Sequence, residues 1–128
     1  MHKILVVDDE PEIEKLLEEF LKKKGFEVLA TSNPEKALEI LESDAKIDLI
    51  VLDMKMPKIK GIDILKTMKR INRVTPVVIL TGSIDAQTYD EELGELGYGL
   101  DDVCYKPVDL MVLLEAIEKK LGLNLNKE

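Results

Sequence analysis

The chain has 128 residues and a formal net charge of −8 at pH 7, which fits one acidic domain. No apolar stretch approaches the roughly 20 residues that a membrane span needs, and the segment before Asp8 is too short for a secretory signal. The acidic balance argues against direct nucleic-acid binding, since phosphate contacts need clustered Lys and Arg. The single cysteine, Cys104, predicts a small buried side chain and a cytoplasmic location rather than a disulfide framework.

Five short apolar runs alternate with longer segments of helical period: residues 3–7, 27–31, 48–53, 76–81 and 102–106. This alternation is typical of βα repeats and a parallel sheet. The first, third and fourth runs are almost continuously apolar, as in strands buried on both faces, whereas the second and fifth are mixed and suit the edges. The predicted fold is therefore α/β: a flavodoxin-like, doubly wound, five-stranded parallel sheet of order 2-1-3-4-5, with five helices.

Helix boundaries can be read from a few residues. Pro11 suits the first turn of a helix, and Gly25 suits the position just after the end of a helix, so the first helix is expected between them. Asn33 can cap the second helix, and Asp109 and Gly122 can bound the last. The third helix carries an inward apolar stripe, Ile62, Leu65 and Met68.

The fourth helix is the weakest of the five. A helical period links Ala86, Tyr89, Leu93 and Leu96. Glycines at positions 94, 97 and 99 interrupt it, and each costs up to about 1 kcal/mol relative to alanine. We expect this region to be the softest in the domain.

Acidic residues follow the strands at the predicted switch point of the sheet. Asp8 and Asp9 come directly after the first strand, and Asp53 closes the third. Because ligand sites in open α/β sheets form beyond the carboxyl ends of such strands, these carboxylates are expected to converge. Their mutual repulsion would raise at least one pKa or recruit a cation. Mg²⁺, which takes one or two carboxylates and shares its coordination with phosphoryl oxygens, suits this set.

Two further strand ends point to the same edge. Thr81 closes the fourth strand with a hydroxyl, and Lys106 closes the fifth with an ammonium. Carboxylates with a metal, a hydroxyl and a lysine make a phosphoryl site based on charge neutralisation and positioning, with the central Asp53 as nucleophile. Glu10 is interpreted as a helix-start residue with at most a peripheral, water-mediated role.

The ordered motifs resemble the receiver domain of two-component response regulators. They are Asp8-Asp9, the run LDMKMPKIKG with Asp53, Pro57 and Gly61, then LTG with Thr81, and YKP with Lys106. The resemblance implies that Asp53 accepts a phosphoryl group from the phosphohistidine of a histidine kinase or phosphotransfer protein. It further implies that Mg²⁺ is held by Asp8 or Asp9, by Asp53 and by the backbone carbonyl of Lys55, and that Thr81 and Lys106 engage the phosphoryl oxygens.

By the same resemblance, residues 1–122 form a receiver domain, and residues 123–128 are a short polar tail. If the sequence is the natural full length, the expected protein is a receiver of the stand-alone type. Such a receiver signals through an unknown downstream protein, and it is not an enzyme beyond slow self-dephosphorylation. One position departs from the family pattern: Val103 stands where most receivers carry an aromatic residue that changes rotamer. Tyr105 points to the same face by strand alternation. Thr81, Tyr105 and Val103 are therefore the candidate switch residues.

Three other functions compete with this interpretation. The first is a receiver-shaped binding module that is never phosphorylated, which the missing aromatic residue keeps open. The second is an aspartate-nucleophile, Mg²⁺-dependent phosphatase of the haloacid-dehalogenase type; that class carries an acid two residues after the nucleophile, where this chain has Lys55. The third, a flavodoxin-like electron carrier, is disfavoured because acids follow the first strand, where a flavin phosphate needs neutral donors.

Overall fold

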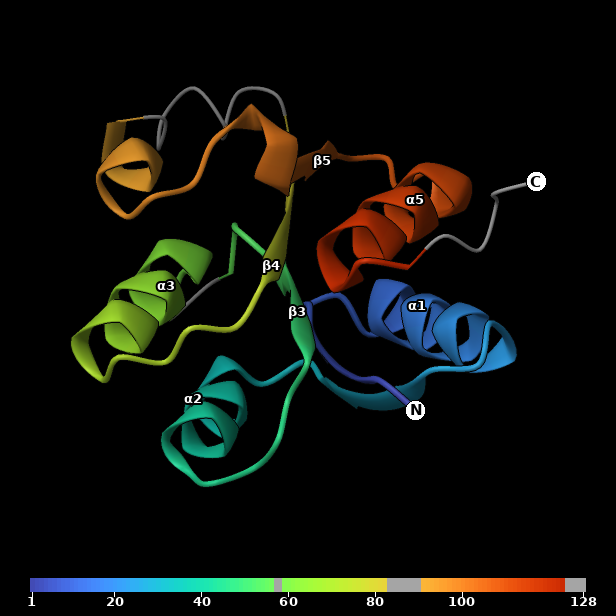
Figure 1. Cartoon of the computed structure of the whole chain (residues 1–128), viewed down its shortest axis with the longest axis horizontal. Coiled ribbons are helices and arrows are strands. Elements are labelled where there is room, and N and C mark those ends of the chain that lie inside the picture. The colour runs from blue at the N-terminus through green and yellow to red at the C-terminus, as the bar shows by residue number, and fades with distance from the viewer. Residues whose placement is uncertain (57–58, 83–90, 124–128) are drawn as a thin grey trace.

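A five-stranded parallel sheet forms the centre of the computed structural model, which describes residues 1–56, 59–82 and 91–123 (Figure 1). The strands are β1 (Lys3–Val7), β2 (Glu27–Thr31), β3 (Leu49–Asp53), β4 (Val77–Thr81) and β5 (Val103–Tyr105). Their order is β2-β1-β3-β4-β5, and every neighbouring pair is parallel. The predicted strand order is confirmed.

Helices cover both faces of the sheet. They are α1 (Pro11–Lys23), α2 (Pro34–Glu42), α3 (Gly61–Arg70) and α5 (Leu110–Leu121), with a 3₁₀ turn, η1 (Leu100–Asp102), before β5. Figure 1 shows α1 and α5 on one side of the sheet and α2 and α3 on the other. This arrangement confirms the doubly wound α/β class. Within the described ranges, no helix is long and apolar enough to cross a membrane.

The core consists of two apolar clusters separated by the sheet. One lies under α2 and α3 and includes Ala37, Leu65 and Met68; the other lies under α1 and α5 and includes Leu17 and Leu113. Every residue of β3 and β4 is buried, whereas β2 and β5 are partly exposed. The two mixed strands are therefore edges, as their composition predicts.

Side-chain caps set the helix boundaries that the sequence predicts. Pro11 and Pro34 occupy the first turns of α1 and α2. The carboxamide oxygen of Asn33 accepts hydrogen bonds at the start of α2, and the carboxylate of Asp109 does the same at the start of α5. Gly122 ends α5 at φ 73°, a left-handed conformation that favours glycine.

The fourth helix can be compared with the prediction only in part. Residues 91–95 are helical, and Leu93 is buried against the α2 and α3 cluster. Ala86 and Tyr89 lie outside the described residues. The expectation that this region is the softest therefore stays a prediction.

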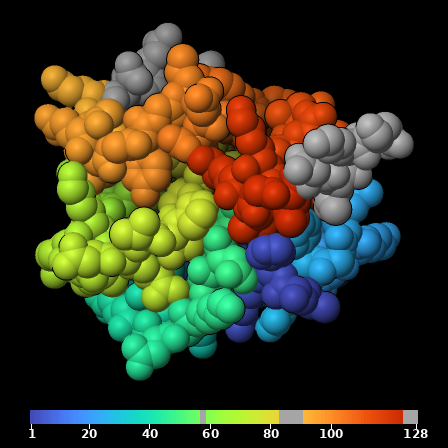
Figure 2. All heavy atoms as spheres, in the orientation of Figure 1, coloured from blue at the N-terminus to red at the C-terminus, as the bar shows by residue number. Residues whose placement is uncertain are grey.

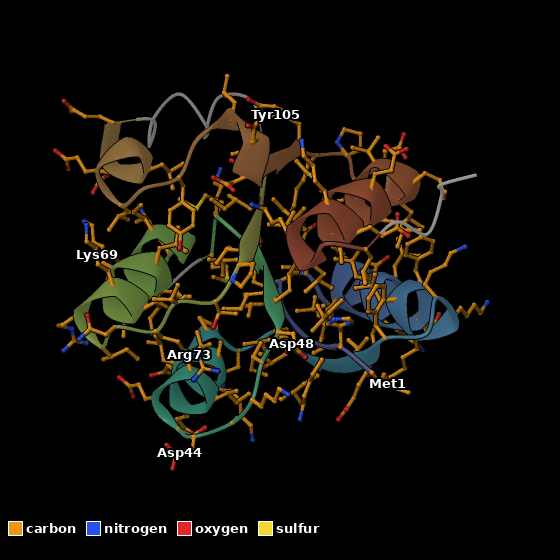
Figure 3. All side chains as sticks on the ribbon, viewed as in Figure 1. Met1, Asp44, Asp48, Lys69, Arg73 and Tyr105 are labelled. Atoms are coloured by element: carbon orange, nitrogen blue, oxygen red, sulfur yellow. The ribbon has the colours of Figure 1, made fainter. Side chains whose placement is uncertain are left out.

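The edge where the strands begin is tied together by side-chain contacts to backbone. Figure 2 shows the start of the chain in blue beside a green segment from the middle of the sequence. Here the carboxylate of Asp48 accepts the backbone N–H of Lys3 at 2.7 Å. Arg73 projects between α3 and α2 (Figure 3), where its guanidinium donates to the carbonyls of Leu41 at 3.1 Å and Ala45 at 2.7 Å. These contacts fix the starts of the strands whose opposite ends carry the candidate site.

Candidate functional site

Strand register brings four polar residues to the carboxyl edge of the sheet. Asp8 follows β1, Asp53 ends β3, Thr81 ends β4 and Lys106 follows β5. The last paired residues of neighbouring strands are Val7 with Leu52, Asp53 with Leu80 and Thr81 with Tyr105. The chain therefore places the predicted acids, hydroxyl and ammonium at one edge.

The ammonium of Lys106 lies at the centre of this group. Its Nζ is 3.1 Å from Glu10 Oε1, 3.3 Å from Asp53 Oδ1 and 3.5 Å from Asp8 Oδ2. The backbone N–H of Lys106 donates to the carbonyl of Thr81 at 2.9 Å, so β4 fixes the position from which the lysine reaches the acids.

Asp53 is a carboxyl group held out of water. It is 1% exposed, and its pKa is raised from 3.8 to about 7. Burial is the main cause, followed by the negative charge of Asp8. The charge of Lys106 and the backbone N–H of Lys55 act in the opposite direction. Asp53 therefore gains from a nearby cation.

The pKa values of two neighbours reflect the same imbalance of charge. Burial raises the pKa of Asp8, which is fully buried, although the N–H of Glu10 and the charge of Lys106 oppose that shift. Burial alone would lower the pKa of Lys106, but the carboxylates of Asp53 and Asp8 outweigh it and raise that pKa. Lys106 is therefore a fixed positive charge that only partly balances the acids.

The acids also offer oxygens suited to a hard cation. Asp8 Oδ2 and Asp53 Oδ2 are buried and accept no hydrogen bond in the described part of the chain, and the cation near Asp8 Oδ2 among these residues is the Lys106 ammonium, 3.5 Å away. Carboxylate oxygens of Asp8, Asp9 and Glu10 lie within 4.8 Å of one another. Buried anionic oxygens without donors are costly unless a cation or proton meets them. The donor set therefore fits Mg²⁺, which prefers carboxylate oxygens and keeps several waters.

The loop after β3 packs closely against the site. The backbone N–H of Lys55 donates to Asp53 Oδ1 at 3.3 Å, and that of Gly61 donates to the carbonyl of Met54 at 3.0 Å. A Cβ on Gly61 would lie 2.7 Å from the carbonyl oxygen of Asp53, so this close approach requires glycine. Pro57, also part of the motif, lies outside the described residues.

The candidate switch residues differ in their surroundings. Thr81 is 1% exposed, and its hydroxyl donates to the carbonyl of Gly82 at 3.1 Å. Tyr105, labelled in Figure 3, is 46% exposed, whereas Val103 is half-buried against the α2 and α3 cluster. Their assignment as switch residues stays a prediction.

Glu10 differs from its predicted role. It precedes α1, as expected, but its side chain makes no capping hydrogen bond there. Its carboxylate instead contacts Lys106 directly, so the peripheral, water-mediated role is wrong. The two residues are 96 positions apart, and no local pattern in the sequence reports such a contact.

Comparison with known proteins identifies the family. Residues 4–118 match the response regulator receiver domain, and the chain belongs to that family of two-component signalling proteins. Members of the family generally accept a phosphoryl group rather than act as catalytic enzymes, typically bind Mg²⁺, and partner with histidine kinases or phosphotransferases.

Two curated relatives show different overall lengths. The transcriptional regulatory protein CpxR of Escherichia coli (strain K12) is 41% identical over 123 residues, which cover 94% of this chain and 50% of CpxR. The chain thus spans about half the length of that relative. Sporulation initiation phosphotransferase F of Bacillus subtilis (strain 168) is 38% identical over 126 residues, covering 97% of both chains.

Solved structures agree with this assignment of the fold. A response regulator receiver domain protein from Clostridium thermocellum has a TM-score of 0.83 at 36% identity and covers 95% of both chains. The chemotaxis protein CheY4 of Vibrio cholerae has a TM-score of 0.81 at 27% identity, covering 94% of this chain and 99% of CheY4.

Proposed function

We propose that this chain is a phosphorylation-dependent signalling switch whose phosphoacceptor is Asp53. The observation that carries the proposal is the environment of this carboxyl group. One oxygen lies 3.3 Å from Lys106 Nζ, and the other is buried without a hydrogen-bond partner among the described residues. The first oxygen is thereby oriented, and the second is available as a nucleophile.

In the proposed reaction, a carboxylate oxygen of Asp53 attacks the phosphorus of a phosphohistidine on a histidine kinase or phosphotransfer protein. A P–O bond to Asp53 forms as the P–N bond breaks. The electron pair of the broken bond stays on the imidazole, which leaves neutral with a proton on its other nitrogen. Lys106 and Thr81 would then donate to the phosphoryl oxygens, whose charge they help to balance.

Mg²⁺ would be held by Asp53, by Asp8 or Asp9, and by the backbone carbonyl of Lys55. When bound, it supplies positive charge between the acids and the incoming phosphoryl group. The raised pKa of Asp53, about 7, supports this assignment because the ionised form needs such a cation. The roles of all these residues are part of the proposal.

The output of the switch would be an altered surface for a downstream protein. Thr81 is followed by residues 82–105, which lead through η1 to β5 and Tyr105. A phosphoryl group that draws the Thr81 hydroxyl away from the carbonyl of Gly82 would change the start of this segment. Amide exchange should therefore change along residues 91–105 on phosphorylation.

The test is phosphorylation by a small donor. Wild-type protein and Asp53→Asn are incubated with acetyl phosphate and Mg²⁺, and the phosphorylated fraction is measured by intact mass. We expect phosphorylation of the wild type only, and we expect no phosphorylation of the wild type when Mg²⁺ is removed before acetyl phosphate is added. Equal phosphorylation of Asp53→Asn, or an unmodified wild type, would overturn the proposal.

A further inference from the structure

We infer that Glu10 is a displaceable partner of Lys106, which holds the lysine ammonium until a phosphoryl group on Asp53 takes its place. Glu10 is thus a positioning residue that opposes phosphorylation rather than a member of the reacting set. The inference rests on the proposed function, because it concerns the same lysine and the same phosphoacceptor.

The first step of the argument concerns hydrogen-bond capacity. A lysine ammonium has three N–H donors. Three carboxylates lie near Nζ of Lys106, at 3.1 Å for Glu10, 3.3 Å for Asp53 and 3.5 Å for Asp8. The carboxylate of Glu10 accepts a hydrogen bond from the ammonium, whereas Asp8 Oδ2 accepts none in the described part of the chain. A new phosphoryl oxygen therefore competes with Glu10 as the acceptor of the lysine N–H.

The second step identifies the partner that leaves. The side chains of Asp8 and Asp53 are 0% and 2% exposed and are fixed at strand ends, so neither can turn to water. Asp8 is further held by the N–H of Glu10, which donates to its Oδ1 at 2.9 Å. The side chain of Glu10 is 59% exposed, and only its carboxylate can return to solvent at little cost.

The third step concerns charge. A phosphoryl group on Asp53 brings additional negative charge toward the carboxylate of Glu10, which already lies close to those of Asp8 and Asp9. Repulsion between Glu10 and the phosphoryl group then adds to the competition for Lys106. Both effects act in one direction: removal of the Glu10 charge should favour the phosphorylated state.

Beryllofluoride, which mimics the phosphoryl group on a carboxylate, provides a direct measurement. Its dissociation constant is determined at saturating Mg²⁺ for wild type, Glu10→Gln and Glu12→Gln. Glu12 is an exposed acid in the first turn of the same helix and is the matched control for general charge effects. We expect Glu10→Gln to bind about two- to fivefold more tightly, the factor typical of one partly exposed ion pair, and Glu12→Gln to match the wild type.

A second measurement requires neither metal nor phosphorylation. Lys106 is acylated with an amine-reactive ester in the presence of a chelator, and the modified peptide is quantified over time. In the free protein the ammonium of Lys106 is paired with the carboxylate of Glu10. We therefore expect Glu10→Gln to raise the acylation rate of Lys106 about two- to fivefold, and Glu12→Gln to leave that rate unchanged.

The outcomes separate this inference from the proposed function. If the wild type binds beryllofluoride but Glu10→Gln binds it equally or more weakly, the proposed exchange of Glu10 for a phosphoryl oxygen at Lys106 is overturned, while Asp53 as phosphoacceptor stands. Weaker binding would instead place Glu10 with the residues that hold the metal. If the wild type neither binds beryllofluoride nor becomes phosphorylated, the proposed function fails and the exchange fails with it. An unchanged acylation rate would overturn the contact itself.

Discussion

Substitution of Asp53 by Asn should stabilise the metal-free protein above neutral pH. The carboxyl group of Asp53 is 1% exposed and lies beside Asp8, and its pKa is about 7 instead of 3.8. At pH values between 3.8 and about 7, the Asp53 carboxyl group holds a proton in the folded protein that it has lost in the unfolded chain. The free energy of unfolding therefore falls as the pH rises through this window, because the native state binds more protons than the unfolded state.

The magnitude follows from the difference in pKa. At 1.36 kcal/mol for each pKa unit, a value about three units above the ordinary one corresponds to about 4 kcal/mol. Relaxation of the site and entry of water reduce this figure, so we expect about 2–4 kcal/mol. Asn has nearly the shape of a protonated Asp and leaves no cavity. The gain in the free energy of unfolding of Asp53→Asn over the wild type should therefore be small near pH 4 and largest near pH 8.

Urea unfolding with a chelator, at several pH values from 4 to 8, measures this effect. The matched control is Asp44→Asn, at an exposed acid in the α2 to β3 loop (Figure 3), for which we expect a change within about 0.5 kcal/mol at every pH. A stability difference between Asp53→Asn and wild type that does not grow with pH would refute the reasoning.

Three further predictions concern the metal, the packing beside the site and the opposite edge of the sheet. Mg²⁺ at ten times its dissociation constant should stabilise the wild type by about 1.4 kcal/mol in thermal unfolding, and Asp8→Asn should lose most of this gain; equal gains would contradict the metal assignment. Gly61→Ala should destabilise by about 1–3 kcal/mol, because its Cβ would lie 2.7 Å from a backbone oxygen, whereas Gly94→Ala, with open space around the Cβ, should be neutral or stabilising. Arg73→Ala should cost about 1–3 kcal/mol by leaving three carbonyls without their donor, and Arg70→Ala, at an exposed position, should change little; equal effects would contradict the role of the guanidinium.

The fold could be predicted because its signals are local and repeated. Continuous apolar runs identify the central strands β1, β3 and β4, and the mixed composition of β2 and β5 places them at the edges. The caps Asn33 and Asp109 are equally local, since each side chain bonds backbone within three residues. Strand order then follows from burial, and the position of the site follows from strand order.

The contacts that the sequence did not predict join distant segments through long side chains. Glu10 reaches Lys106 across 96 positions, and Arg73 reaches the carbonyl of Leu41 across 32. A lysine, glutamate or arginine side chain has several rotatable bonds, so strand register fixes its Cα but not the atom that its tip will meet. The convergence of Asp8, Asp53 and Lys106 could be predicted; the additional partner of Lys106 could not.

Chemical trapping of the phosphorylated residue tests the central claim most directly. Protein treated with acetyl phosphate and Mg²⁺ is reduced with borohydride, which converts an aspartyl phosphate to homoserine, and the peptides are sequenced by mass spectrometry. The account predicts homoserine at position 53 in the treated wild type and none without acetyl phosphate. Homoserine at Asp8 or Asp9 instead, or at no position, would contradict it.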